Sequence, residues 1–94
     1  MATRTQTKKT TVKKAPAVVG LEELVGHSVT LYCGVFIYTG TLVAVGPTAA
    51  KLADASIVFE TGELTSRTWA IAEKLPTPHW WVMLAAVESF GPGK

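Results

Sequence analysis

Apolar residues cover positions 29–60 almost without a break, and the stretch is rich in β-branched and aromatic residues. Short apolar runs bounded by glycine and proline are typical of strands. Turn signals at Gly34 and at Gly46 divide the stretch into three strands. Gly40 lies in the middle of the second strand, where glycine lets a strand bend or bulge and serve two sides of a barrel. The pattern predicts a small, strongly bent antiparallel sheet.

The flanking sequence adds two helical segments and two further strands. Residues 21–25 (LEELV) have the length of one helical turn, with acidic residues early, as the helix dipole favours. Thr65 is a good N-cap for a helix over 66–75, which Pro76 stops. The five predicted strands cover residues 27–33, 35–45, 50–60, 79–86 and 87–90. The fold class is therefore mainly β: a five-stranded small barrel with an N-terminal helical turn and a helix inserted between strands three and four.

Charge divides the chain into an arm and a body. Residues 1–17 are rich in threonine and lysine and have little to bury, which predicts a basic flexible arm before a domain over 18–94. Residues 1–16 carry a charge of +5, and residues 17–94 carry −3 because seven acids outnumber four bases. The arm is the predicted nucleic-acid contact, through Arg4, Lys8, Lys9, Lys13 and Lys14.

Composition points to burial between subunits and to a reducing compartment. Apolar residues make up 48% of the chain and charged residues only 17%, which favours covering part of the surface with another copy. The single cysteine, Cys33, excludes an internal disulfide framework and lies at strand period, as a small buried hydrophobe does. Because the chain shows neither a membrane-length apolar run nor a secretory signal, we expect a cytoplasmic protein.

Four short stretches of the predicted strands carry further motifs. They are LVGHSV at the start of the first strand, GTLV at the bend of the second, LADA in the third and AVESF in the last, at residues 24–29, 40–43, 52–55 and 86–90. Over residues 18–60 and 79–91 the chain resembles the Sm-like (LSm/Hfq-type) family. The LEELVG start, the YTGTLV bend, the WW strand and the VESFG end together resemble Sm-like proteins of tailed bacteriophages.

This resemblance implies a homo-oligomeric ring of about five to seven subunits. In such rings the fourth strand of one subunit pairs with the fifth strand of the next, so that a neighbour caps each open sheet edge. A fourth strand that is apolar on both faces, as HWWVMLAA is, suits burial between the barrel and a neighbour. The expected interface residues are Trp80, Trp81, Met83, Val87 and Phe90.

The chain departs from the family at its RNA-binding positions. The aspartate and asparagine of the family's turn after strand two fall on Gly46 and about Ala50, and its arginine-glycine pair falls within LAA at 84–86. Base recognition needs hydrogen-bonding groups or a basic, aromatic groove, so uridine binding does not transfer. The remaining ring-face and stacking candidates are Tyr38, Pro47, Thr48, Lys51 and Trp69, with packing inside the subunit as the alternative for the aromatic residues.

The sequence offers no catalytic constellation. His27 and His79 stand far apart, and neither has a cysteine or carboxylate at ligand spacing, so we expect no metal site. The acidic residues form no paired-acid motif, and the turn at Gly46 lacks the lysine of a phosphate-binding loop. We therefore expect neither an enzyme nor a cofactor.

These features favour a non-enzymatic, ring-forming binding or assembly module, encoded by a phage and located in the bacterial host cytoplasm. Nucleic acid is the leading partner, held by the arm and the ring-face loops, and no membrane is involved. One alternative is a structural virion or assembly protein whose arms lace subunits and other phage structural proteins together. Another is a ring that sequesters a small nucleotide in pockets between subunits.

Overall fold

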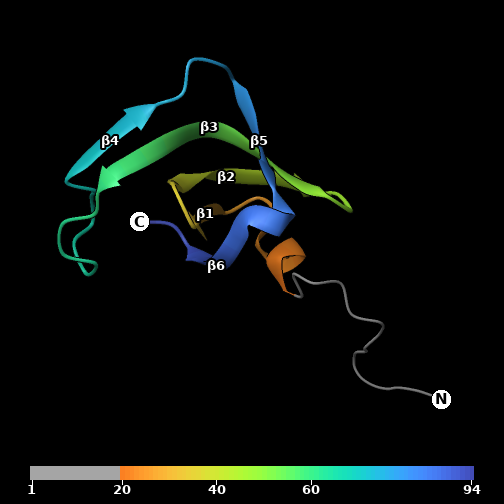
Figure 1. Ribbon diagram of the computed structural model, residues 1–94, viewed down its shortest axis with the longest axis horizontal. Helices are drawn as coiled ribbons and strands as arrows, with labels where there is room; N and C mark the ends of the chain where they lie inside the picture. The colour runs from red at the N-terminus through yellow and green to blue at the C-terminus, as the bar shows by residue number, and fades with distance from the viewer. Residues whose placement is uncertain (1–19) are drawn as a thin grey trace.

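The computed structural model describes residues 20–94, which form one antiparallel sheet of six strands (Figure 1). Two short 3-10 helices accompany it, η1 at Leu21–Leu24 and η2 at Leu84–Ala86. The strands are β1 Ser28–Cys33, β2 Ile37–Val45, β3 Ala49–Glu60, β4 Ile71–Lys74, β5 His79–Met83 and β6 Val87–Pro92. The mainly β, antiparallel fold predicted from the sequence is confirmed, and η1 is the predicted helical turn.

The strand order is β4-β3-β2-β1-β6, and β5 also pairs with β3. Residues 49–53 of β3 pair with β5, and residues 56–60 pair with β4. β4 and β5 therefore follow one another along the same edge of β3 and share one lateral position. The six strands occupy five positions side by side, which is why a five-stranded prediction described most of the sheet.

A bulge in β3 faces the break between β4 and β5. Asp54 has a φ of 53°, a left-handed backbone that is uncommon outside glycine, although aspartate tolerates it better than most residues. Its N–H donates to the carbonyl oxygen of Pro78 at 3.1 Å. The Leu75 N–H donates to the carbonyl oxygen of Ala55 at 2.8 Å. These two hydrogen bonds keep the edge of β3 paired where the sheet turns sharply.

Gly40 marks the bend of β2, as the sequence predicted. The β2–β3 register shifts between Thr39 and Thr41, so the two strands curve together. A Cβ atom on Gly40 would lie 3.0 Å from the Ala53 carbonyl oxygen and 3.1 Å from the Ala55 Cα atom. The close approach of the two backbones therefore requires glycine at this position.

One hydrophobic core lies inside the bend. Its buried side chains come from η1 and from four strands, β1, β2, β3 and β5, and half-buried apolar residues surround them. Burial of this apolar surface is the main driving force for the fold. The core residues are Leu21, Val29, Leu31, Leu42, Ala50, Leu52, Ala55 and Val82.

The helix predicted over residues 66–75 is wrong. Residues 64–70 form turns and loop, and Ile71–Lys74 is strand β4. β3 is 12 residues long and β5 covers only its first half, so β4 satisfies the backbone groups of the second half. A ten-residue helix is marginal alone, and this long-range pairing overrides its local propensity. The predicted arm, residues 1–17 with Arg4, Lys8, Lys9, Lys13 and Lys14, lies outside the described residues.

Candidate interaction surface

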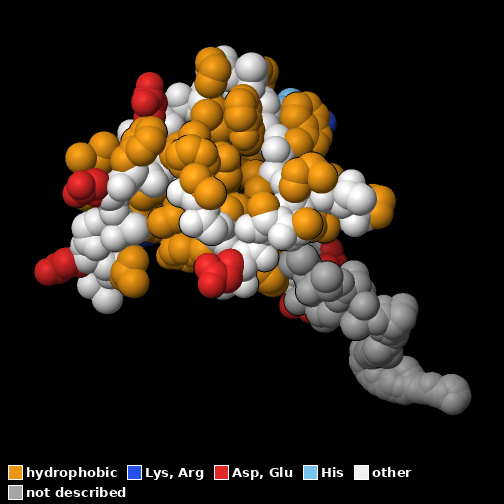
Figure 2. All heavy atoms as spheres, viewed as in Figure 1, with side chains coloured by type: hydrophobic (Ala, Val, Ile, Leu, Met, Phe, Trp, Pro, Cys, Tyr) orange, Lys and Arg blue, Asp and Glu red, His pale blue; other side chains and the backbone are white. Residues whose placement is uncertain are grey.

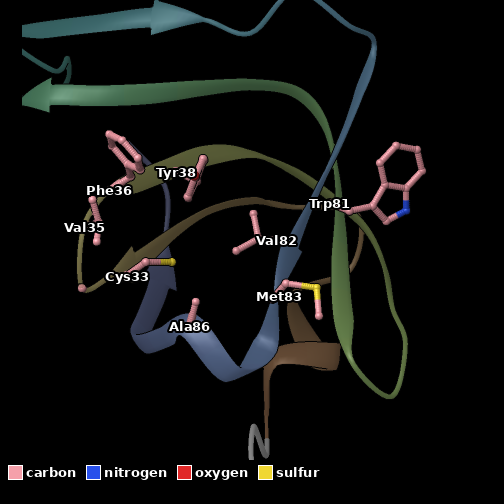
Figure 3. Close-up of a pocket in the computed structure, with 9 residues that line it drawn as sticks. Cys33, Val35, Phe36, Tyr38, Trp81, Val82, Met83 and Ala86 are labelled. Atoms are coloured by element: carbon pink, nitrogen blue, oxygen red, sulfur yellow. The ribbon is translucent and has the colours of Figure 1, made fainter.

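An apolar cleft of about 600 Å³ lies between the β1–β2 turn and β5 (Figure 3). The side chains of Cys33, Val82 and Ala86 point toward this space, whereas the Trp81 indole turns away from it. The volume is within the range of small-molecule and peptide side-chain pockets. The residues lining the apolar cleft are Cys33, Gly34, Val35, Phe36, Tyr38, Trp81, Val82, Met83 and Ala86.

The β1–β2 turn forms one wall of the cleft. The Cys33 N–H donates to the Phe36 carbonyl oxygen at 3.0 Å, which closes a tight turn with Gly34 and Val35 at its tip. Turn tips are usually polar, yet Val35 is 84% exposed and Phe36 is 42% exposed. Two large apolar side chains are therefore exposed at a surface turn beside the cleft.

The ionisable groups in the cleft stay neutral at physiological pH. Burial raises the pKa of the Cys33 thiol. Burial also raises the pKa of Tyr38, and the negative charge of a Cys33 thiolate adds to that rise. A thiol with a raised pKa is a poor nucleophile, since the thiolate is the reactive form. The cleft therefore offers an uncharged surface suited to binding apolar groups.

The outer face of β5 carries a second apolar group of side chains. Trp81 is 59% exposed and Met83 is 55% exposed, because alternate residues face away from the core that Val82 enters. The Lys51 ammonium lies 5.5 Å from the Trp81 ring centroid, and the His79 ring lies 6.3 Å from it. We call His79, Trp81 and Met83, together with Lys51, the outer β5 face.

Both ends of the sheet present strand edges. Among residues 20–94, β5 pairs with β3 alone and β6 pairs with β1 alone. Figure 2 shows apolar side chains across the middle of the face in view, with acidic side chains around them. An unpaired strand edge beside exposed apolar side chains is a template for adding another strand.

The remaining predicted site residues are more scattered. Trp80, Val87 and Phe90 are half-buried and pack against the hydrophobic core. Pro47 and Thr48 are exposed in the β2–β3 turn. The cleft and the outer β5 face therefore unite only part of the predicted set: Tyr38, Lys51, Trp81 and Met83.

Trp69 lies elsewhere, in the loop between β3 and β4 rather than on a helix. It is half-buried beneath Lys94, whose ammonium is 4.2 Å from the ring centroid. Sequence reasoning missed Lys94 altogether and assigned no binding role to Val35 or Phe36. The pair Val35-Phe36 directly after Gly34 was a usable signal, because turns seldom carry two large apolar residues.

Within residues 20–94, no group of three His, Cys, Asp or Glu side chains gathers to hold a metal ion. The same part of the chain contains no helix long and apolar enough to cross a membrane. Comparison of the chain with family models, with curated proteins and with solved structures found no match. The features of residues 20–94 that bear on function are the strand order, the two sheet edges and the apolar surface beside them.

Proposed function

We propose that the chain is an Sm-like small barrel that assembles into a ring and serves as a non-enzymatic binding module. The observation that carries this proposal is the lateral order β6-β1-β2-β3-β4/β5. It supports a barrel whose two end strands remain available, so that the β5 edge of one subunit pairs with the β6 edge of the next. A closed ring leaves no strand edge uncovered.

The apolar surface beside β5 supports the same assembly. A large aromatic side chain buries about 150–250 Å². Trp81 is 59% exposed, so covering it at about 25 cal/mol per Å² contributes about 2–4 kcal/mol to each contact between subunits. Val35, Phe36 and Met83 add apolar area next to it. We infer that a neighbouring copy covers the apolar cleft.

Nucleic acid is the proposed partner of the ring. Five cations in residues 1–16, repeated once per subunit, give a strong attraction for phosphates. Binding through the arm needs no base-specific residues in the β2–β3 turn, where the aspartate and asparagine of the Sm-like family are missing.

Sequestration of a nucleotide receives less support. The residues that line the apolar cleft carry no charged side chain, and phosphates are held by charged or converging hydrogen-bond donors. The alternative structural role in a virion assumes the same ring. It differs from the proposal only in what the ring binds.

A native mass spectrum of the protein purified without nuclease tests the proposal. We expect a species of about five to seven times the 10.0 kDa subunit mass, together with bound RNA or DNA. A ring of that size with no nucleic acid after gentle purification favours the structural role. A monomer at micromolar concentration overturns the assembly.

A further inference from the structure

Four groups of the β3–β4 loop converge on the ammonium of Lys94. The Nζ atom donates to the carbonyl oxygens of Thr61 at 3.3 Å, Glu63 at 2.9 Å and Thr68 at 3.2 Å. The ring of Trp69 also lies close, with its centroid 4.2 Å from Nζ. We call these three carbonyl groups and the Trp69 indole the ammonium cage.

The cage matches a primary ammonium group. An alkylammonium has three N–H donors and no acceptor, and the cage supplies three acceptors. An indole face attracts a cation through its quadrupole. A quaternary ammonium has no N–H to donate, and the flat fork of a guanidinium directs its donors into one plane rather than toward three separate carbonyls.

The loop holds two of these carbonyls in place through hydrogen bonds of its own. The Ser66 N–H donates to the Glu63 carbonyl oxygen at 3.0 Å, and the Ala70 N–H donates to the Thr61 carbonyl oxygen at 3.4 Å. Gly62 between them has a φ of 67°, which glycine adopts without strain. The loop itself therefore orients two of the three acceptors that Lys94 contacts.

The cage also joins distant parts of the sheet. Lys94 follows β6, one end of the strand order, and the loop precedes β4, the other end. Figure 1 shows the end of the chain beside this loop. The neighbouring Gly93 N–H donates to the Ser28 carbonyl oxygen at 2.8 Å and so fixes the approach of Lys94.

We propose that the β3–β4 loop is a binding site for a primary ammonium group and that Lys94 is its resident ligand. When Lys94 leaves, the site accepts a primary ammonium from solution. The contact between Lys94 and the ammonium cage links the two ends of the sheet. The acceptors of the cage belong to the β3–β4 loop rather than to β5 or β6, so the site does not depend on the proposed ring contact.

Nuclear magnetic resonance of the full chain tests the resident contact. Protons above an indole ring resonate upfield, so we expect the ε-methylene protons of Lys94 upfield of those of the other lysines. Trp69→Leu removes this shift. Arg67→Gln removes a positive charge from the same exposed loop and leaves the shift in place. Ordinary Lys94 shifts in the wild-type protein overturn the proposal.

Chemical rescue tests the specificity of the site. Lys94→Met keeps an unbranched, flexible side chain and removes the ammonium from the cage, and Lys94→Gln serves as a second variant. At low ionic strength, which limits screening, butylammonium is titrated against tetramethylammonium and guanidinium at equal concentration. We expect butylammonium alone to return the Trp69 indole N–H resonance toward its wild-type position. No response to butylammonium, or an equal response to all three cations, overturns the proposed site.

Discussion

Thr30 and Thr39 are direct partners across the β1–β2 ladder, and their hydroxyl groups differ in hydrogen bonding. The Thr39 Oγ1 donates to the Val29 carbonyl oxygen at 2.9 Å. Thr30 is 2% exposed, and its Oγ1 finds no hydrogen-bond partner among residues 20–94. A buried hydroxyl without a partner loses its hydration and gains nothing in return.

This difference predicts opposite effects for the same substitution at the two positions. Thr30→Val replaces an unpaired hydroxyl with a methyl group of similar shape, and we expect the free energy of unfolding to rise by about 1 kcal/mol. Thr39→Val removes a hydrogen bond and is expected to lower it by about 0.5–1.5 kcal/mol. Urea unfolding measures both. Equal destabilisation by the two variants means that the Thr30 hydroxyl has a partner in solution.

The bend at Gly40 predicts a strong effect of adding one methyl group. Gly40→Ala places a Cβ atom 3.0 Å from the Ala53 carbonyl oxygen and 3.1 Å from the Ala55 Cα atom, and neither backbone atom moves easily. We expect a loss of about 1–3 kcal/mol in the free energy of unfolding, the usual cost of overpacking. Gly34→Ala is the matched control, because its Cβ atom meets nothing within 4 Å. A comparable loss for Gly34→Ala contradicts this explanation.

The parts of the fold that the sequence predicted depend on local pattern. Gly40 inside an apolar strand indicated the bend, and turn residues at Gly34 and Gly46 gave the strand limits within a few residues. The helix predicted at 66–75 was wrong because the structure of this segment depends on a distant partner rather than on local pattern. Its structure is set by the unpaired half of β3, and nothing in the sequence of the segment records the length of that partner.

The candidate sites depend still more on long-range geometry. Lys94 donates to backbone carbonyl groups 26 to 33 residues away. Every residue has a backbone carbonyl group, so the residue types do not show which of them contact Lys94. The apolar cleft exists because the curved sheet brings the β1–β2 turn near β5. Exposure of Trp81 and partial burial of Trp80 follow from which face of β5 meets the core, and a strand that is apolar on both faces does not reveal this.

The raised pKa values of Cys33 and Tyr38 predict loss of stability in alkali. Their folded-state pKa values lie above the unfolded values, so their contribution is complete below the ordinary thiol pKa of about 8.5 and declines as the pH rises beyond it. We expect the free energy of unfolding to fall from about pH 8.5 upward. Cys33→Ala is expected to reduce the fall that begins near the thiol pKa, and Tyr38→Phe the fall at higher pH. Identical alkaline slopes for wild type and both variants contradict these assignments.

The two adjacent tryptophans of β5 predict different outcomes for the same change. Trp81→Lys alters an exposed side chain, so we expect a folded protein whose mass in solution drops from ring to monomer. Trp80→Lys places a charge against the core and is expected to lower the melting temperature instead. Light scattering gives the mass, and circular dichroism gives the melting temperature. Phe59→Lys, at the far end of β3 and also exposed, is the control expected to keep the ring. A ring of unchanged mass in Trp81→Lys removes the outer β5 face from the interface.

The basic arm predicts a salt-dependent affinity for single-stranded nucleic acid that disappears with its charge. Replacing Arg4 and the four arm lysines by glutamine keeps the length of the arm and changes the net charge per subunit from +2 to −3. For single strands, each neutralised phosphate contributes about −0.7 to the slope of log affinity against log salt concentration. Five contacts per subunit therefore predict a slope of about −3.5, and the substituted arm is expected to bind weakly with a nearly flat slope. Fluorescence anisotropy of a labelled oligonucleotide at several salt concentrations measures both quantities. Unchanged affinity and slope in the substituted protein place the contact on the described body instead, where Lys51, a predicted ring-face residue, is the first position to substitute.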